Sequence, residues 1–475
     1  MVSEEGEPSQ LPSETADDAP SVQSTRLATS CLFLLLDCDR PWSGGGRFML
    51  SGTDEVIIGR GNTRRCDRES ANSTRRLKLT WPTTTLSAKH VRLLRVGDDW
   101  AIQDRGSRNG TCLNGYRVDY AELHDRDVFQ VGRTFFMFRR YMDLASGSVL
   151  TDIVEQAPLE SQQSLASLSP EIALENQSLR SAAQSSLAVL ILGLTGTGKE
   201  LTARNIHDLS GRTGQFCAVN CGAIPAGLVE SVLFGHVKGA FSGAVSNQLG
   251  VIRAADEGTL FLDEIGDLAP QAQAALLRVL QEGEVMPIGA ARAIPVNLRI
   301  ISATHQPLQE LVQQGQFRAD LYARLAGYVH QLRPLGARLE DFGLLFGQLL
   351  QRAAPGAAEK VTLTNEAGWA LLLHPWSLNI RELEQAIARA IVLGKSGPLA
   401  AKHFPFVLKP RTQTESGIES KKLSADVALK QQLDDLLREH HGNVTAVARA
   451  LGKGPTQIQR WMKRLGLVAD AYRLG

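Results

Sequence analysis

The chain has 475 residues, of which 43% are hydrophobic, 21% charged and 6% aromatic, and its formal net charge at pH 7 is +1. This length exceeds what one hydrophobic core supports, so several domains are expected, and the composition excludes a wholly disordered or collagen-like chain. No apolar run approaches the ~20 residues that span a bilayer, and six cysteines without a CxxC pair argue against a disulfide framework or a zinc site. We therefore expect a cytoplasmic protein without a membrane anchor.

The first part of the chain changes character twice. Residues 1–25 are rich in Glu, Asp, Ser and Pro, so we expect a disordered leader. Residues 26–143 contain short β-like runs such as Glu55 to Ile58 and Val91 to Val96, separated by Gly and Asn turns, which predicts an all-β sandwich. Residues 144–168 are rich in Ser, Gln and Ala and have no sustained period, which indicates a linker.

Four short motifs occur in order within the β-rich region: Gly-Arg at 59–60, Ser-Ala-Lys-His at 87–90, an eight-residue run at 104–111 and Asn-Gly at 114–115. The ordered set resembles a forkhead-associated (FHA) domain. The resemblance implies a phosphothreonine protein or a Ser/Thr kinase as partner, with contacts from Arg60, Ser87, Lys89, Arg108 and Asn109. A phosphate needs a forked cation and neutral donors on loops of a rigid scaffold, and these residues supply both. The alternative is a domain that keeps this fold for packing alone.

From residue 169 to 407, apolar strands alternate with helical patterns, which predicts a parallel α/β domain with a small helical lid at about 335–407. The sequence GLTGTGK at 193–199 follows an apolar strand and precedes a helical pattern, as a phosphate-binding loop does. Its N–H groups can cradle phosphates while Lys199 neutralises their oxygens. The expected nucleotide contacts in this region are Gly193, Gly196, Thr197, Gly198, Lys199 and Glu200.

A second apolar strand, at 258–264, ends in two carboxylates. Asp263 can hold Mg²⁺, and Glu264 can polarise the attacking water. Buried strands rarely end in an acidic pair by chance. The pair therefore predicts an ATPase that uses ATP and Mg²⁺.

Three runs, GLTGTGKE at 193–200, LFGHVKGAFSGA at 233–244 and GTLFLDEIGDL at 258–268, closely resemble the AAA+ ATPase domain of sigma-54-dependent transcriptional activators. That family normally has Glu after the loop lysine. The resemblance implies that one loop touches sigma-54 through Phe241, and this loop comprises Gly239, Ala240, Phe241, Ser242, Gly243 and Ala244. An exposed Phe between small residues suits an interaction tip, and the alternative is a core Phe in a tight turn.

The same resemblance implies further roles in the α/β domain. Asn220 would restrain Glu264 until the nucleotide state changes, and Thr304 with His305 would sense the γ-phosphate. Arg381 would contact the nucleotide from the lid. Arg318 and Arg324 would reach into a neighbouring subunit of a homo-oligomeric ring, expected to be a hexamer, and their alternative is a solvated helix face. This chain departs from the family pattern at Ser242, Ala319, Ala323 and Gly336.

The C-terminal part begins with a polar stretch at 408–424, which indicates a second linker. In the following region, 425–475, the run GNVTAVARALG at 442–452 predicts a helix and a tight turn, and Pro455 to Leu465 predicts a second helix. This all-α helix-turn-helix resembles the Fis-like DNA-binding domains that end such activators, and a dimerisation bundle is the alternative. The expected DNA contacts are Thr456, Gln457, Gln459, Arg460, Lys463 and Arg464.

Together these parts predict a sigma-54-dependent transcriptional activator. It would bind upstream double-stranded DNA, hydrolyse ATP as a ring to open the sigma-54 RNA polymerase complex, and respond to phosphothreonine. Two alternatives are a DNA-binding regulator that does not act through sigma-54 and a phosphopeptide adaptor with nucleotide binding as an assembly switch. The intact acidic pair and GAFSGA loop argue against the first, and Arg318 and Arg324 argue against the second.

Overall fold

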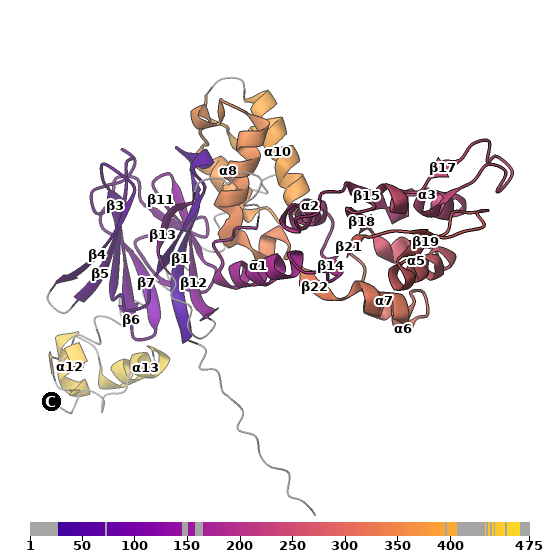
Figure 1. Ribbon diagram of the computed structural model, residues 1–475. Coiled ribbons are helices and arrows are strands. Elements are labelled where there is room, and N and C mark those ends of the chain that lie inside the picture. Colours follow the sequence, from indigo (N-terminus) through magenta and orange to yellow (C-terminus); the bar gives the residue numbers. More distant parts are fainter. Residues whose placement is uncertain are drawn as a thin grey trace, which may run out of the picture.

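The computed structural model describes residues 27–71, 74–144, 151–156, 165–394 and 397–405 and, nearer the C-terminus, 433, 436–437, 439–440, 442–451 and 454–465. The predicted leader at 1–25 and the predicted linker at 408–424 lie outside these residues. Figure 1 shows a β-sandwich at one end, an elongated α/β domain at the other and a helical lid between them. Among the described residues, no helix has the length and apolarity that a membrane crossing requires.

The N-terminal region is a two-sheet β-sandwich, which confirms the all-β prediction. One sheet has the order β13-β2-β1-β12-β11-β8-β9 and the other the order β10-β7-β6-β3-β5-β4. Their inward side chains, among them Phe48, Trp81 and Phe136, form a buried core. The strands are β1 (Leu27–Asp37), β2 (Gly45–Met49), β3 (Glu55–Arg60), β4 (Arg65–Ala71), β5 (Thr74–Trp81), β6 (Val91–Val96), β7 (Asp99–Asp104), β8 (Thr111–Leu113), β9 (Tyr116–Val118), β10 (Tyr120–Leu123), β11 (Val128–Val131), β12 (Thr134–Leu144) and β13 (Ile153–Gln156).

The segment 144–168, which the sequence indicates to be a linker, is built into the domains where the structure describes it. Strand β13 pairs with β2 at the sheet edge, and the Asp152 carboxylate accepts hydrogen bonds from the Arg68 guanidinium and the Met49 N–H, each at 2.8 Å. Farther along, Ser167 and Leu168 donate to the buried Asp341 carboxylate. The residues that make these contacts are polar and unevenly spaced along the segment, so no repeating apolar pattern in the sequence could indicate them.

The α/β domain is built on a parallel sheet with the order β15-β18-β21-β14-β22. Parallel strands bring their carboxyl ends to one edge, where ligands of such sheets bind. The sheet strands are β14 (Val189–Leu192), β15 (Phe216–Asn220), β18 (Thr259–Asp263), β21 (Arg299–Thr304) and β22 (Tyr328–Gln331), and two short ribbons join β16 (Gly235–His236) to β17 (Gln248–Leu249) and β19 (Glu284–Val285) to β20 (Ile294–Pro295). The helices are α1 (Pro170–Ala183), α2 (Lys199–Leu209), α3 (Val229–Phe234), α4 (Val251–Ala254), α5 (Pro270–Glu282), α6 (Leu308–Gln313) and α7 (Ala319–Leu325).

One hydrophobic core joins the sandwich to the lid, which consists of α8 (Phe342–Ala353), α9 (Asn365–Leu373) and α10 (Asn379–Leu393). Strand β1 is apolar at every position from 31 to 36, and both of its faces are buried. Leu32 and Leu34 face the interior of the sandwich. Phe33 and Leu35 pack instead with Phe342 and other lid residues. A strand without polar alternation is the pattern expected when both faces are covered.

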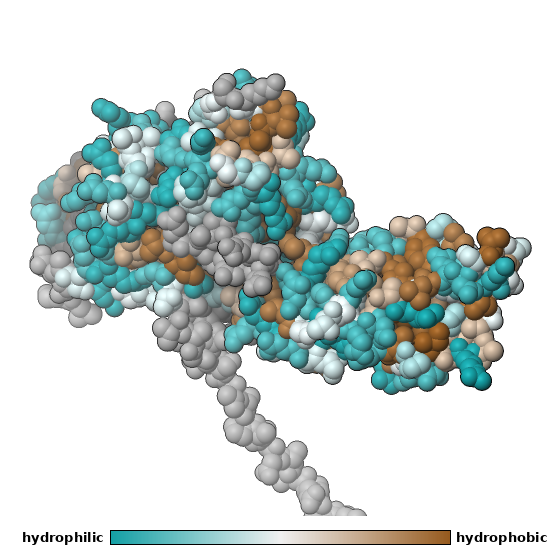
Figure 2. Space-filling view, turned by 45° about the horizontal axis from the view of Figure 1, so that its top comes forward, coloured by the Kyte–Doolittle hydropathy of each residue, from teal (hydrophilic) through white to brown (hydrophobic). Residues whose placement is uncertain are grey.

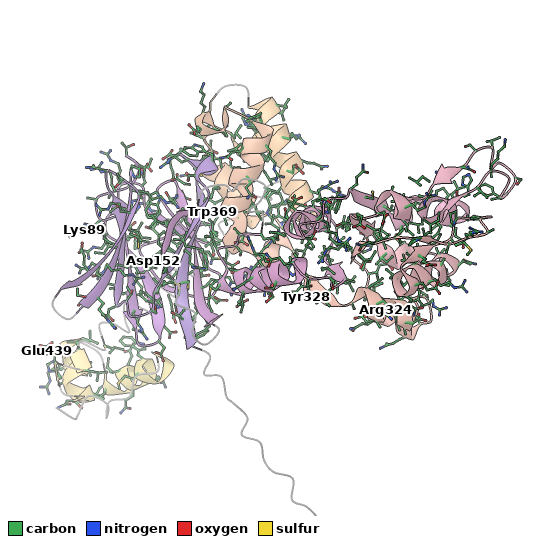
Figure 3. The ribbon with its side chains drawn as sticks, in the orientation of Figure 1. Lys89, Asp152, Arg324, Tyr328, Trp369 and Glu439 are labelled. Atoms are coloured by element: carbon green, nitrogen blue, oxygen red, sulfur yellow. The ribbon has the colours of Figure 1, made fainter. Side chains whose placement is uncertain are left out.

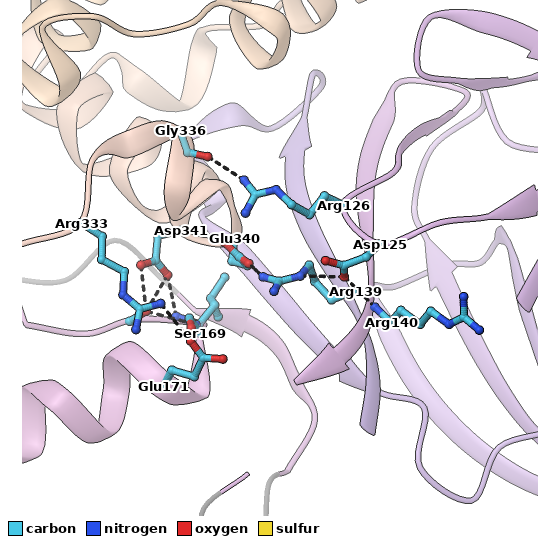
Figure 4. A network of polar contacts seen from close by, with 12 residues as sticks. Asp125, Arg126, Arg139, Arg140, Ser169, Glu171, Arg333, Gly336, Glu340 and Asp341 are labelled. Carbon is cyan, nitrogen blue, oxygen red and sulfur yellow. Dashed lines mark hydrogen bonds and ion pairs between the residues drawn. The ribbon is translucent and has the colours of Figure 1, made fainter. Parts of the chain in front are cut away.

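Close backbone approach and polar contacts reinforce this joint, and Figure 4 shows the polar contacts. A Cβ atom at Gly343 of α8 would lie 2.8 Å from the Leu35 carbonyl oxygen, and one at Gly368 of α9 would lie 2.6 Å from the Phe135 ring. Only glycine permits such packing. The Arg139 guanidinium of β12 pairs with the buried Glu340 carboxylate, and the Arg126 guanidinium donates to the Gly336 carbonyl at 2.6 Å. The sandwich and the lid are therefore one packed unit.

Near the C-terminus, helices α12 (Val444–Ala450) and α13 (Pro455–Leu465) pack around a small core that includes Val447, Ile458 and Met462. The Asn443 side chain accepts hydrogen bonds from the first turn of α12. The bounds of α13 coincide with the predicted second helix.

Candidate functional site

The loop at 193–199 connects β14 to α2 and has the shape of a phosphate cradle. Gly196 and Gly198 have φ angles of 78° and 101°, a left-handed conformation that glycine adopts without strain. The Gly193 N–H donates to the Thr304 carbonyl at 3.1 Å, which fixes the loop to β21. Thr197 Oγ1 donates to the Leu194 carbonyl at 2.8 Å, so this hydroxyl braces the loop. The predicted glycines and Lys199 thus lie together at the start of a helix, where anions bind.

The lid closes directly on this loop through the first residues of α10. The N–H groups of Ile380 and Arg381 donate to the Gly196 carbonyl at 2.9 and 3.3 Å. The Asn379 side chain donates to the Thr195 carbonyl at 3.0 Å. A Cβ atom at Gly196 would lie 2.1 Å from the Leu378 carbonyl oxygen, so no side chain fits there. Arg381 therefore reaches the predicted site through its backbone, while its side chain is exposed.

The acidic pair occupies the end of β18, beside the loop. Lys199 Nζ lies 3.1 Å from both Glu264 Oε1 and the Gly193 carbonyl oxygen. His305 Nδ1 lies 2.8 Å from Glu264 Oε2, and the His305 N–H also donates to that oxygen at 3.2 Å. A carboxylate accepts hydrogen bonds only, so the imidazole is the donor here. Glu264 is consequently held between the loop lysine and the residue that follows β21.

The Asn220 side chain contacts Asp263 rather than Glu264, and the role predicted for it stays a prediction. Its side chain donates to Asp263 Oδ2 at 3.4 Å and accepts from the Ala223 N–H at 3.0 Å. The reason is register, because β15 and β18 pair in parallel with Asn220 opposite Asp263. Glu264 is one residue farther and, with φ 50° and ψ 51°, turns toward β21 instead. His305 makes the contact with Glu264 that was expected of Asn220. Only the order of the strands in the sheet indicates that His305 lies close enough to do so.

The Asp263 and Glu264 carboxylates lie in different electrostatic environments. Burial, aided by the negative charge of Glu264, raises the pKa of Asp263 above its usual range. Burial also acts to raise the pKa of Glu264, but hydrogen bonds from His305 and Lys199 outweigh it and hold that pKa low. Among the described residues, Asp263 Oδ1 is buried without a hydrogen-bond partner. An unpartnered, desolvated carboxylate oxygen beside a phosphate cradle fits a divalent cation such as Mg²⁺.

A pocket between α1, α2 and the lid opens beside Thr197 and Gly198. Its apolar lining includes Ile172, Leu201 and Ile380, and its polar lining includes Asn176, His330, Arg333, Arg338 and Asp341. A pocket of mixed apolar and polar lining beside the loop is a candidate site for a nucleoside whose phosphates lie on the loop. No sequence pattern indicates these residues, because they come from distant parts of the chain and carry no shared motif.

Other predicted residues of this domain lie outside the cradle. Glu200 is exposed and pairs with Arg204 at 2.7 Å, one turn farther along α2, so its predicted nucleotide contact stays a prediction. Position 200 lies on the outer face of the helix. Arg318 precedes α7 and pairs with Asp320 at 2.7 Å, whereas Arg324 is exposed on α7 and labelled in Figure 3. No hydrogen bond or ion pair connects either arginine to the loop at 193–199 in the described part of the chain.

The GAFSGA loop, residues 239–244, lies between β16 and β17 at the end of the α/β domain farthest from the sandwich (Figure 1). The Gly239 N–H donates to the Ala244 carbonyl at 2.8 Å, which closes the loop at its base. Phe241 is 40% exposed and its ring lies 5.0 Å from that of His236. The nearby Val245 is 83% exposed, and Figure 2 shows hydrophobic residues gathered at this end. The alternative of a core Phe is therefore wrong.

The FHA-like motifs meet on loops at one end of the sandwich. The Arg60 N–H donates to the Ser87 carbonyl at 2.9 Å, and the Arg108 N–H donates to Ser87 Oγ at 3.4 Å. The Asn109 side chain donates to the Thr85 carbonyl at 2.7 Å. The structure thus brings together the residues predicted to bind phosphothreonine. The guanidiniums of Arg60 and Arg108 are exposed, and the described residues give neither an ion-pair partner.

A buried histidine organises these loops. The Ser87 N–H donates to His90 Nδ1 at 3.2 Å, and His90 Nε2 lies 3.1 Å from the Gly110 carbonyl oxygen. Burial lowers the pKa of His90. The ring is therefore neutral, with Nδ1 as acceptor and Nε2 as donor. The segment from Asn62 to Arg76, which is rich in arginine, contributes strand β4 and the start of β5, which extend the sheet edge beyond β3.

The residues predicted to contact DNA lie on α13. Gln457, Gln459 and Arg460 are exposed there, opposite the buried Ile458 and Met462. The side chains of Thr456, Lys463 and Arg464 lie outside the described part.

Three family models match separate parts of the chain. The Sigma-54 interaction domain matches residues 147–330, the AAA+ ATPase lid domain residues 337–421 and the FHA domain residues 56–132. These matches confirm the predicted AAA+ and FHA-like architecture.

Curated relatives share the central part of the chain. The hydrogenase transcriptional regulatory protein HoxA of Cupriavidus necator is 41% identical over 295 residues, which cover 59% of this chain and 61% of HoxA. The transcriptional regulatory protein GlrR of Escherichia coli is 40% identical over 301 residues, which cover 62% of this chain and 66% of GlrR. The chain thus spans slightly less than two thirds of these relatives. A crystal structure of NtrX from Brucella abortus in complex with ADP is 27% identical, with a TM-score of 0.47, covering 65% of this chain and 71% of NtrX. By its family matches, the chain combines a sigma-54 interaction domain and an AAA+ lid with an FHA domain.

Proposed function

We propose that this protein is an ATP-hydrolysing activator of sigma-54 RNA polymerase, acting in the cytoplasm on upstream DNA and regulated through phosphothreonine. The observation that carries the proposal is the combination, within one domain, of an intact acidic pair beside a phosphate cradle and an exposed GAFSGA loop. The phosphate cradle would bind ATP, whose hydrolysis supplies the energy. The GAFSGA loop would supply the surface that contacts the polymerase. The regulatory proteins HoxA and GlrR support this assignment by their similarity.

In the hydrolysis step, Lys199 binds the terminal phosphates and Glu264 orients the attacking water. Asp263 would hold Mg²⁺, which neutralises charge on the phosphate oxygens. Lys199 and His305 both contact the Glu264 carboxylate. A phosphate that takes Lys199 from Glu264 frees the carboxylate to act as base. Arg318 and Arg324, both exposed, would complete the site of a neighbouring subunit in a homo-oligomeric ring, for which a hexamer remains our expectation.

The effect of phosphothreonine binding would be transmitted to the ATPase domain through the packed joint between the sandwich and the lid. The lid contacts the phosphate loop through Asn379, Ile380 and Arg381. The opposite side of the lid shares its core with β1 and β12. A phosphoprotein or kinase that binds Arg60, Ser87, Lys89, Arg108 and Asn109 therefore acts on a body that touches the nucleotide site. Helix α13 would bind DNA through Gln457, Gln459 and Arg460, with Thr456, Lys463 and Arg464 beside them.

Phe241→Ala tests the proposal with purified protein, sigma-54 RNA polymerase and a promoter template. ATP turnover should persist, while open-complex formation should be lost, because the phenyl side chain supplies the apolar area that is buried on docking. Val245→Ala, at a more exposed neighbouring position, is the matched control and should keep both activities. Open complexes formed by Phe241→Ala at the wild-type level would overturn the sigma-54 contact.

Glu264→Gln separates hydrolysis from binding in the same assay. We expect nucleotide binding to persist and turnover to fall by about 10²-fold or more, because the amide cannot act as a base. The surface substitution Glu282→Gln should leave turnover unchanged. A protein that hydrolyses ATP but opens no sigma-54 complex in the wild-type form would instead be a DNA-binding regulator or an adaptor.

A further inference from the structure

Four residues that lie between the sandwich and α1, Leu165 to Leu168, are anchored in two different hydrophobic cores, and we call this segment the strap. The Leu165 side chain packs in a core of the α/β domain that includes Val189 and Phe261. The Leu168 side chain is fully buried in the core that the sandwich shares with the lid. Because so few residues separate the two anchors, a displacement of one is passed on to the other.

The strap also forms one wall of the pocket beside the phosphate loop. Leu165 and Ala166 line this pocket together with Thr197 and Gly198 of the loop. A nucleoside whose phosphates lie on the loop would therefore pack against the strap. The position of the strap sets how closely this wall approaches the nucleoside, and so how tightly the nucleoside binds.

The lid holds the strap from one side through Asp341, which lines the same pocket and is almost fully buried. Ser167 Oγ donates to Asp341 Oδ2 at 2.8 Å, and the Leu168 N–H donates to Asp341 Oδ1 at 2.7 Å. Figure 4 shows Asp341 in contact with this segment, just before α1. A buried carboxyl group needs such donors, because leaving it without hydrogen bonds costs free energy. The contact therefore fixes the strap against the lid.

The sandwich holds the strap from the other side through Arg47 of β2, a buried arginine. In the described part of the chain its hydrogen bonds go to two backbone carbonyls, that of Leu168 at 2.8 Å and that of Thr151 at 3.4 Å. A Cβ atom at Gly45 would lie 2.6 Å from Leu168 Cδ1, so the Leu168 side chain lies directly on the backbone of β2. Burying a cation costs free energy, and the contact with the strap offsets part of that cost.

We propose that Arg47 is a positioning residue for nucleotide binding, which acts through the strap on the wall of the nucleoside pocket. The inference rests on the proposed function, which has the domain bind ATP at this loop. It makes the affinity for nucleotide depend on the sandwich, through one hydrogen bond to the Leu168 carbonyl. The groups proposed to act in hydrolysis, Lys199 and Glu264, do not contact Arg47. The rate at saturating ATP is therefore independent of it.

Steady-state ATP hydrolysis and calorimetry with ADP, both on the full-length protein, separate binding from chemistry. Arg47→Met removes the hydrogen-bond donor and keeps much of the apolar stem. We expect the KM for ATP and the Kd for ADP to rise about tenfold, the size of effect that follows the loss of a hydrogen bond from a charged group, while kcat stays the same. Arg47→Lys, which keeps a charged donor, should recover most of the affinity.

The matched control is Arg133→Met. Arg133 also donates from the sandwich to a carbonyl outside it, that of Leu363 at 2.5 Å, but it does not contact the strap. This variant should keep the wild-type KM. An equal rise in its KM would show that a loosened joint, and not the strap, sets the affinity, and it would overturn the role of Arg47.

Ser167→Ala tests the strap from the lid side and protects the test against an Arg47→Met variant that does not fold. It removes one donor to Asp341 and should raise the KM by a smaller factor, because the Leu168 N–H still holds the carboxyl group. An unchanged KM in folded Arg47→Met, or in Ser167→Ala if Arg47→Met does not fold, overturns the inference alone. Wild-type protein that binds no nucleotide overturns the proposed function and the inference with it.

Discussion

The two outward faces of the β-sandwich differ in what covers them. On the seven-stranded sheet, Phe33, Leu35 and Phe135 are buried against lid helices. On the six-stranded sheet, the corresponding outward positions include Glu55, Arg76 and Arg92. The first face is a structural joint, whereas the second carries charged side chains. A single domain is thus fixed to the lid through one of its two faces.

The largest expected effect comes from breaking the joint. Phe342→Ala removes a fully buried ring from the shared core and should lower the free energy of unfolding by about 3–5 kcal/mol. Chemical denaturation, followed by tryptophan fluorescence, measures it. Leu393→Ala, at a half-exposed position of α10, is the control and should have little effect. If Phe342→Ala left the stability unchanged, the shared core would not hold the two parts together.

The buried ion pair of the joint is expected to contribute less. Arg139→Met leaves the buried Glu340 carboxylate without its partner. Because Arg139 is partly exposed, we expect a loss of about 2 kcal/mol, below the ~3–5 kcal/mol for a fully buried pair. The double variant Arg139→Met with Glu340→Met should recover much of that loss. Additive losses in a double-mutant cycle would show that the pair is not coupled across the joint.

The smallest effect concerns pH and the loop end of the sandwich. Because the folded-state pKa of His90 lies below 6.5, protonation favours the unfolded state. The stability that neutral His90 contributes is present above pH 6.5 and is lost as the pH falls through 6.5 toward the folded-state value. His90→Gln can keep both hydrogen bonds and should flatten this part of the stability profile. The exposed His124→Gln should not, and identical profiles for all three proteins would exclude His90 as the cause.

Local motifs made the two groups of candidate phosphate-binding residues recognisable in the sequence. The loop at 193–199 and the acidic pair are contiguous runs whose backbone setting is fixed by a neighbouring strand, so their residues could be named in advance. The FHA-like motifs are equally short, and the structure brings Arg60, Ser87 and Asn109 together on adjoining loops. The sequence does not indicate what covers the second face of the apolar strand at 31–36, which is buried on both sides.

The sequence by itself determined the order of the domains, the identity of the phosphate loop and the position of the acidic pair, because each depends on residues close together in the chain. Only the tertiary structure decided that His305 rather than Asn220 holds Glu264, since sheet register sets that contact. It alone joined the sandwich to the lid and placed the Arg47 guanidinium against the Leu168 carbonyl. Such contacts link residues that the chain separates, and only packing brings them within reach of one another.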